Sequence, residues 1–90
     1  MKYIVLELQV TDGVKREVPI VFPNCLTHAI VAESIVSSPE LKGAVAISAG
    51  FIDMDANTCY SESESLKLKS RGVTDRLLID CHDHLNGLVH

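Results

Sequence analysis

The 90-residue chain has no tryptophan, and its two phenylalanines and two tyrosines make up only 4% of it. Proteins that bind single-stranded nucleic acid usually stack the bases on exposed aromatic rings. Basic residues are also few: 8 Lys and Arg face 12 Asp and Glu, which gives a formal net charge of -4. A domain that binds phosphate backbones is expected to be basic. Both shortages argue against a nucleic-acid partner.

Cysteines and long apolar runs are scarce as well. Cys25, Cys59 and Cys81 are odd in number and too widely spaced for a disulfide framework or a zinc ribbon. No apolar run approaches the roughly 20 residues that a membrane-spanning helix needs. Glu7 and Gln9 interrupt the first apolar run, and no signal-peptide cleavage site follows it. We therefore expect a cytoplasmic protein with reduced thiols and no membrane partner.

Hydrophobic residues make up 47% of the chain, enough to form the core of a single domain spanning residues 1–90. Residues 3–10 and 15–22 both alternate apolar and polar side chains, which predicts two strands. Asp12-Gly13 predicts the turn between them. Pro19 cannot donate a ladder hydrogen bond, so the second strand is expected at a sheet edge. The expected buried side chains are Ile4, Leu6, Leu8, Val10, Val18, Ile20 and Phe22.

A helix is predicted from His28 to about Ser37, with Thr27 as its N-cap and Ser38-Pro39 after its end. Its small apolar residues suit packing against a sheet. Such a crossover allows the first and third strands to lie side by side.

Residues 44–60 predict a central hairpin of two strands, joined by a turn at Asp55-Ala56-Asn57. Apolar and small residues alternate along 45–52, which is typical of a strand buried on one face and partly covered on the other. Gly50 within this run indicates either a bulge or a close neighbouring backbone.

The C-terminal third is predicted to be extended first and then helical. If residues 61–71 are extended, Leu66 and Leu68 face the core, and a basic row formed by Lys67, Lys69 and Arg71 faces the other way. Thr74 is expected to cap a helix from Asp75 to Leu85, which Asn86-Gly87 ends. The buried side of this helix is expected to carry Leu77, Leu78, Cys81 and Leu85. A short strand over 76–80 is the alternative.

These elements predict an α+β fold with a small antiparallel, or mixed, sheet of about four strands. The expected order is β-β-α-β-β-α, with the helices packed on one face of the sheet.

Two clusters could carry chemistry. Cys81, His82 and His84 are all competent metal ligands. On a helix, however, the two histidines point about 200° apart, and on a strand Cys81 turns away from them. Cys25 and His28 could form a thiolate-base pair, but catalysis also needs an orienting group and an oxyanion hole. We expect a buried Cys81, a semi-buried Cys25 and a surface His28, and thus neither a cofactor nor an enzyme.

The strongest candidate for an interaction surface is the run of alternating charge that follows Tyr60. Alternating Ser and Glu residues followed by alternating Lys residues could dock an anionic partner or one of mixed charge. Its members are Glu62, Ser63, Glu64, Ser65, Lys67, Lys69 and Arg71. We expect a small, non-enzymatic interaction or regulatory protein that binds another protein, and a homodimer formed through a sheet edge is compatible with this. The alternative is a small metal-dependent protein or enzyme that uses Cys81, His82 and His84.

Three segments together resemble a group of short proteins from phages, prophages and bacterial genomes. They are Phe22-Pro23, the SAGF sequence of residues 48–51 and the SESLKLKSR sequence of residues 63–71. Where that group often has Cys-His-Gly, this chain has Cys59-Tyr60-Ser61. The resemblance implies a phage or prophage setting and no particular activity.

Overall fold

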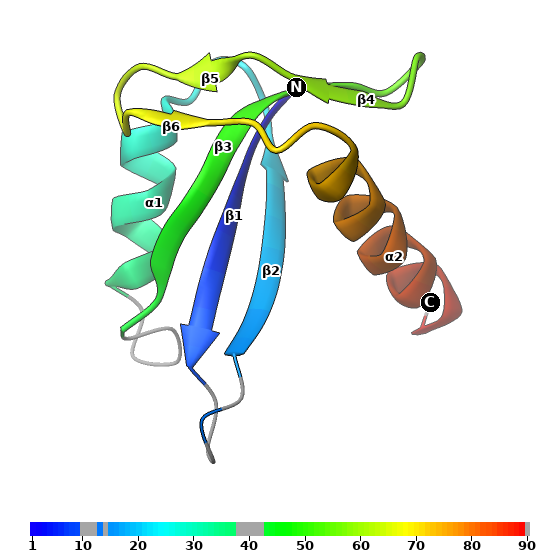
Figure 1. Cartoon of the computed structure of the whole chain (residues 1–90), viewed down its shortest axis with the longest axis horizontal. Coiled ribbons are helices and arrows are strands. Elements are labelled where there is room, and N and C mark those ends of the chain that lie inside the picture. The colour runs from blue at the N-terminus through cyan, green and yellow to red at the C-terminus, as the bar shows by residue number, and fades with distance from the viewer. Residues whose placement is uncertain (10–12, 14, 38–42, 90) are drawn as a thin grey trace.

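A computed structural model describes residues 1–9, 13, 15–37 and 43–89, with the backbone alone for Gln9, Val36 and residues 82–89 (Figure 1). The elements in chain order are β1 (Lys2–Gln9), β2 (Lys15–Phe22), α1 (His28–Val36), β3 (Val45–Asp53), β4 (Thr58–Tyr60), β5 (Glu62–Ser63), β6 (Leu68–Lys69) and α2 (Val73–Val89).

The main sheet has four antiparallel strands in the order β2-β1-β3-β4, and β5 and β6 form a separate small hairpin. The predicted α+β class and antiparallel sheet are confirmed. β1 lies beside β3, and β2, which contains Pro19, is an edge strand, both as predicted. The two short strands β5 and β6 extend the predicted order to β-β-α-β-β-β-β-α.

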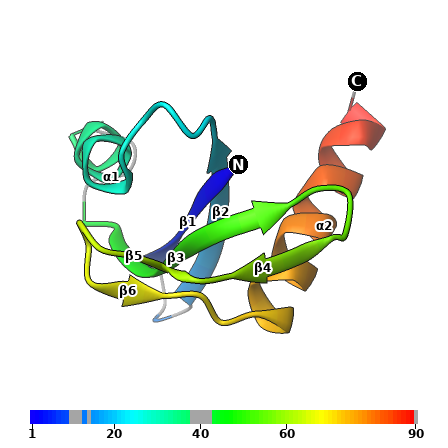
Figure 2. The ribbon, with the colours of Figure 1, turned by 90° about the horizontal axis from the view of Figure 1, so that it is seen from above.

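The two helices pack on opposite faces of the sheet, so their predicted placement on one face is wrong (Figure 2). Ile4 and Leu6 of β1 belong to the cluster that contains Ala32 of α1. Tyr3 and Val5, which point the other way, belong to the cluster that contains Ile79 of α2. Residues 3–6 of β1 are all apolar. Since consecutive side chains of a strand alternate between faces, both faces of β1 are apolar, and each must be covered by a helix.

The register between β1 and β3 shifts by one residue, which breaks the predicted strict alternation along β3. Val5 lies opposite Ser48 and Leu6 opposite Ala46, so Ile47 is the extra residue of a bulge. As a result, two consecutive residues face α2: Ile47 packs against the cluster on the α2 side, and the hydroxyl of Ser48 donates to Asp75 of α2.

Gly50 is required by a close backbone approach, one of the two explanations expected for it. A Cβ added at Gly50 would lie 2.6 Å from the carbonyl oxygen of Tyr60 and 3.1 Å from the Cβ of Ser70. The first distance is shorter than real Cβ contacts allow, so any side chain here would push β4 away from β3.

The prediction of α1 is confirmed, including its cap. Thr27 has an extended backbone, and its Oγ1 accepts a hydrogen bond of 3.2 Å from the amide of Ile30. The predicted strand residue Val10, the turn residue Asp12 and the helix stop at Ser38-Pro39 lie outside the described residues.

The C-terminal segment is a helix, and the alternative of a strand over 76–80 is wrong. It begins at Val73, so Thr74 lies inside it and does not cap it, and it continues past Asn86-Gly87. Of its predicted buried side, Leu78 does pack against the cluster that contains Ile79, but Leu77 is 55% exposed and Cys81 is exposed, so those two predictions are wrong. The side chain of Leu85 lies outside the described part. The helix instead turns Asp75 and Ile79 inward. Among the described helices, none is long and apolar enough to span a bilayer.

Candidate functional site

The β5–β6 hairpin is held in shape by hydrogen bonds within the segment 61–70. Its strands pair Glu62 with Lys69, and the amide of Ser70 donates to the carbonyl of Ser61 over 3.0 Å. In the connecting turn, the Oγ of Ser63 accepts a 3.2 Å hydrogen bond from the amide of Leu66. Ser63 is only 1% exposed, so it supports the turn from within.

The hairpin is also fixed to the body of the protein on the α1 side. Leu66 and Leu68 pack against the cluster that includes Ile4, so their predicted inward orientation is confirmed. The Oγ of Ser65 accepts a 3.3 Å hydrogen bond from the amide of Ala29 in the first turn of α1. These contacts join the hairpin to both a strand and a helix.

The residues predicted for the interaction surface separate into two groups. The exposed members are Glu62, Glu64, Ser65, Lys67, Lys69 and Arg71. Ser63 is buried, and the guanidinium of Arg71, although exposed, is engaged in ion pairs of 2.7 Å with Asp75 and with Glu17. Lys67 and Lys69 are therefore the basic residues that the hairpin offers to a partner, whereas Arg71 stabilises the fold through its ion pairs.

Beside the hairpin lies a hollow of about 330 Å³, which is large enough for a small ligand or a single side chain. Its lining residues are Lys2, Thr27, His28, Phe51, Ser61, Glu62, Glu64 and Ser65. Three of them, Glu62, Glu64 and Ser65, belong to the predicted interaction surface. The Nζ of Lys2 donates a 2.9 Å hydrogen bond to the carbonyl of Leu26, which fixes its charge near the hollow.

His28 is buried, with 4% of its surface exposed, so the expected surface position is wrong. Its Nε2 lies 2.9 Å from the carbonyl oxygen of Gly50. A carbonyl can only accept, so Nε2 carries the proton that is shared in this bond. The bond ties the first turn of α1 to the middle of β3.

Aromatic rings converge on His28, although the chain has few of them. The centroid of His28 lies 5.5 Å from Phe22 and 5.8 Å from Phe51, both in edge-to-face geometry. Phe51 in turn stacks on Tyr60 at 6.0 Å. Three of the four Phe and Tyr residues therefore form one row with His28, and the middle of this row, His28 and Phe51, lines the hollow.

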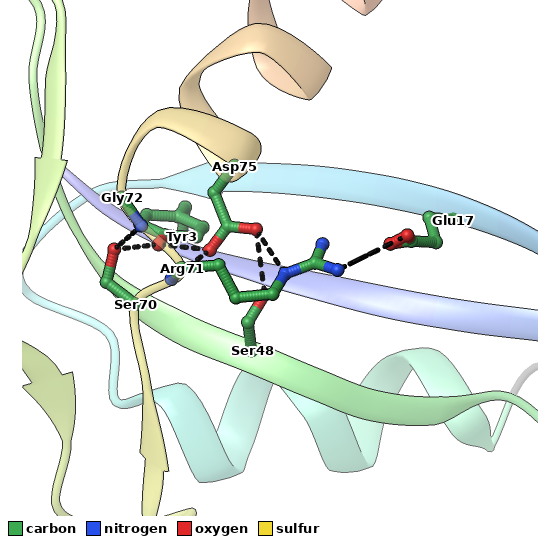
Figure 3. A network of polar contacts seen from close by, with 7 residues as sticks. All are labelled: Tyr3, Glu17, Ser48, Ser70, Arg71, Gly72 and Asp75. Atoms are coloured by element: carbon green, nitrogen blue, oxygen red, sulfur yellow. Dashed lines mark hydrogen bonds and ion pairs between the residues drawn. The ribbon is translucent and has the colours of Figure 1, made fainter.

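A second polar cluster, around Asp75, is buried and fully bonded (Figure 3). The Oδ2 of Asp75 accepts from the phenol of Tyr3 at 2.6 Å and from the backbone amide of Arg71 at 2.9 Å. Its Oδ1 accepts from the Nε of Arg71 at 2.7 Å and from the hydroxyl of Ser48 at 3.1 Å. Burial and the hydrogen bond to Asp75 raise the pKa of Tyr3 far above its usual range.

These contacts anchor the start of α2 to β1 and β3. The Nη1 of Arg71 extends the anchor to β2 through a 2.7 Å contact with Glu17. The Oγ of Ser70 accepts from the amide of Gly72 at 3.0 Å and lies 2.6 Å from the Tyr3 phenol oxygen. Every carboxylate oxygen of Asp75 is used, so the cluster stabilises the fold and has no free acceptor for a ligand.

The cysteine and histidine candidates lie in two places, the start of α1 with the turn before it, and the second half of α2. Since residues 81–84 are helical, the strand arrangement that would align His82 and His84 is wrong, and the side chains of both lie outside the described part. Among the described side chains, no group of three His, Cys, Asp or Glu residues could hold a metal. Cys25 is exposed rather than semi-buried, and the nearby His28 binds Gly50.

Fold and site together define a small α+β protein with a charged hairpin and an aromatic-walled hollow. No protein-family model, curated protein or solved structure matches the chain. Lys2, His28 and Phe51 line the hollow although their local sequence did not predict it. The only local signal was the position of His28 directly after the Thr27 cap, which fixes it at the start of a helix.

Proposed function

We propose that this is a small, non-enzymatic interaction or regulatory protein of the cytoplasm that binds a partner protein through its β5–β6 hairpin. The phage or prophage setting belongs to the same proposal. The supporting observation is that Glu62, Glu64, Lys67 and Lys69 are exposed together on a hairpin that the rest of the protein holds in place.

A fixed hairpin favours binding because little conformational entropy remains to be lost on association. Fixing the backbone of one residue costs roughly 1–2 kcal/mol of conformational entropy. Here the backbone is already held by the bonds at Ser63, Ser65 and Ser70. Charges of both signs then select a partner with the complementary pattern and speed its association.

The test is affinity capture from an extract of the source cells, with the recovered proteins quantified by mass spectrometry. Lys67→Glu/Lys69→Glu reverses the exposed charge of the hairpin. Lys15→Glu/Arg16→Glu makes the same change on exposed residues of β2 and is the matched control. Arg71 is left unchanged because it anchors α2.

We expect one protein to be recovered with the wild type and the control and to be lost with the hairpin variant. Equal recovery with all three folded proteins would contradict the proposal. So would a native mass spectrum showing one transition-metal ion per chain that is lost in His82→Ala/His84→Ala, since it would favour the metal-dependent alternative.

A further inference from the structure

We propose that the hollow binds the guanidinium group of an arginine side chain carried by the partner protein. This inference rests on the proposed function, because it names what the partner inserts beside the hairpin. Three features of the lining carry it: its charge, a free acceptor on a buried histidine, and the aromatic wall.

The charged groups of the lining favour a cation. Glu62 and Glu64 contribute two carboxylates, and Lys2 contributes one ammonium group. The Lys2 ammonium already donates to the carbonyl of Leu26. The two glutamates are exposed, and no ion pair joins either of them to a cation of the described residues. An incoming cation therefore has two carboxylates to pair with.

His28 offers a hydrogen-bond acceptor at the hollow. Its Nε2 donates to Gly50, so in the neutral ring Nδ1 holds a lone pair. Nδ1 has no hydrogen-bond partner among the described residues. Among the described residues, every buried side-chain nitrogen or oxygen that solvent cannot reach has a hydrogen-bond partner. Nδ1 has no such partner, so solvent must reach it. Since His28 lines the hollow, Nδ1 is reached through it and can accept from a ligand N–H.

The aromatic wall suits a flat cation. Phe51 lines the hollow, and its ring is supported by Tyr60 at 6.0 Å and by His28 at 5.8 Å. A cation placed within about 6 Å of an aromatic ring centroid is attracted by the negative face of the ring. Because the Phe51 ring is already held by these two neighbours, binding does not have to order it.

An arginine fits this set of groups better than a lysine. The guanidinium is planar, so it can stack on Phe51, and its five N–H donors point in fixed directions within one plane. It can therefore bond to a glutamate and to the Nδ1 of His28 at the same time. A lysine ammonium has three donors on a compact, strongly hydrated group and gains less from an aromatic face.

The probe is the capped peptide acetyl-Gly-Arg-Gly-amide, titrated into the isotope-labelled protein and followed by NMR at the His28 and Phe51 rings. The same peptide with citrulline keeps the shape and removes the charge, and the lysine peptide keeps the charge and removes the plane. We expect the arginine peptide to bind at least about tenfold more tightly than either, a difference of about 1.4 kcal/mol.

Glu62→Gln/Glu64→Gln should weaken the arginine peptide by about tenfold or more. Glu33→Gln, at an exposed site on α1 outside the lining, should leave its binding unchanged. Lys2→Met should tighten it, because a like charge is removed. Equal binding of the arginine and citrulline peptides, or no shift at either ring, would overturn the inference.

The two proposals can fail separately. If Lys67→Glu/Lys69→Glu abolishes capture of the partner but Glu62→Gln/Glu64→Gln does not, the hairpin binds its partner without an arginine in the hollow. The proposed function would then stand, and the inference would be wrong. If the arginine peptide binds as expected but neither Lys67→Glu/Lys69→Glu nor Glu62→Gln/Glu64→Gln reduces capture of the partner, the hollow binds a guanidinium and the proposed function of the hairpin is wrong.

Discussion

The phenol oxygen of Tyr3 lies 2.6 Å from the Oδ2 of Asp75, although 72 residues separate them along the chain. A phenol has one proton and a carboxylate can only accept, so Tyr3 donates to Asp75. The hydroxyl of Ser70, 2.6 Å from the same phenol oxygen, is left to donate to it. The first strand and the last helix are thereby joined inside the protein.

Removing the Asp75 carboxylate should cost a large part of the stability. Asp75→Ala removes the acceptor of the Arg71 Nε and of the buried hydroxyls of Tyr3 and Ser48. Leaving a buried hydrogen-bonding group without its partner typically costs about 1–3 kcal/mol, and two such groups are affected here. Urea unfolding followed by circular dichroism measures the loss. If Asp75→Ala does not fold, Asp75→Asn, which keeps the shape, should show a smaller loss.

Asp55→Ala is the control for this measurement, since Asp55 is exposed in the β3–β4 turn. Its effect should stay within about 0.5 kcal/mol, as is usual for surface changes. An Asp75→Ala protein as stable as Asp55→Ala would show that the buried network does not hold α2 in place.

Stability should fall in alkali, because two acids are held protonated in the fold. Burial, followed by the hydrogen bond to Asp75, raises the pKa of Tyr3 above its ordinary 10.0. Burial, followed by the charge of Asp75, raises the pKa of Cys59 above 9.0. Above each ordinary value the unfolded chain loses a proton that the folded chain keeps, so the free energy of unfolding decreases as pH rises.

The decrease should begin near pH 9 and steepen above pH 10, by up to about 1.4 kcal/mol per pH unit for each group. Urea unfolding between pH 8 and 11 measures it. Tyr3→Phe should remove the fall in stability above pH 10, and Cys59→Ala should remove the fall that begins near pH 9. Tyr60→Phe, at an exposed ring, should change neither. Stability that is constant up to pH 11 would contradict the burial of both groups.

Gly50→Ala should destabilise the protein by more than about 1–3 kcal/mol, the usual cost of overpacking. The added Cβ would lie 2.6 Å from the carbonyl of Tyr60, and backbone cannot yield as a side-chain end can. It should also shift the His28 resonances, since Gly50 accepts its hydrogen bond.

Gly13→Ala is the comparison for this change. An added Cβ meets nothing within 4 Å there, and only the left-handed φ of +75° opposes it. Its cost should stay near 1–2 kcal/mol. A smaller cost for Gly50→Ala than for Gly13→Ala would show that β4 is not held against β3 at this point.

The three thiols should react at two distinct rates with a thiol reagent. Cys25 and Cys81 are exposed and should react fast. Cys59 is buried with a raised pKa, so little of it is thiolate, and it should react only when the protein opens. Cys81→Ser should remove one fast equivalent. Three equal rates would be incompatible with the placement of Cys59 in the core.

Local signals predicted local structure well. Thr27 sits before a helical run and does cap it, and Pro19 marks the edge strand. The bulge at Ile47 was not predictable, because a shift in register depends on how β1 and β3 pair and not on either strand alone. The inward turn of Asp75 also depends on distant donors, and a carboxylate by itself predicts exposure.

The difference between local and long-range signals also explains which parts of the site were predicted. Glu62 and Glu64 were predicted because alternating charge is visible in a short stretch of sequence. The hollow also needs His28 and Phe51, which come together only because β3 returns beside β1 and places the Gly50 carbonyl under α1. Nothing in the spacing of the aromatic residues indicates that they form one row.

The position of β1 between β2 and β3 has a consequence for the order of folding. This strand precedes all of its partners along the chain, yet it needs Phe51 opposite Lys2 on one side and α2 over Tyr3 and Val5. Closing such long loops costs conformational entropy before the contacts between their ends compensate for it. A nascent chain that ends before Asp75 leaves one apolar face of its central strand bare. The native packing around β1 is therefore complete only once α2 has been made.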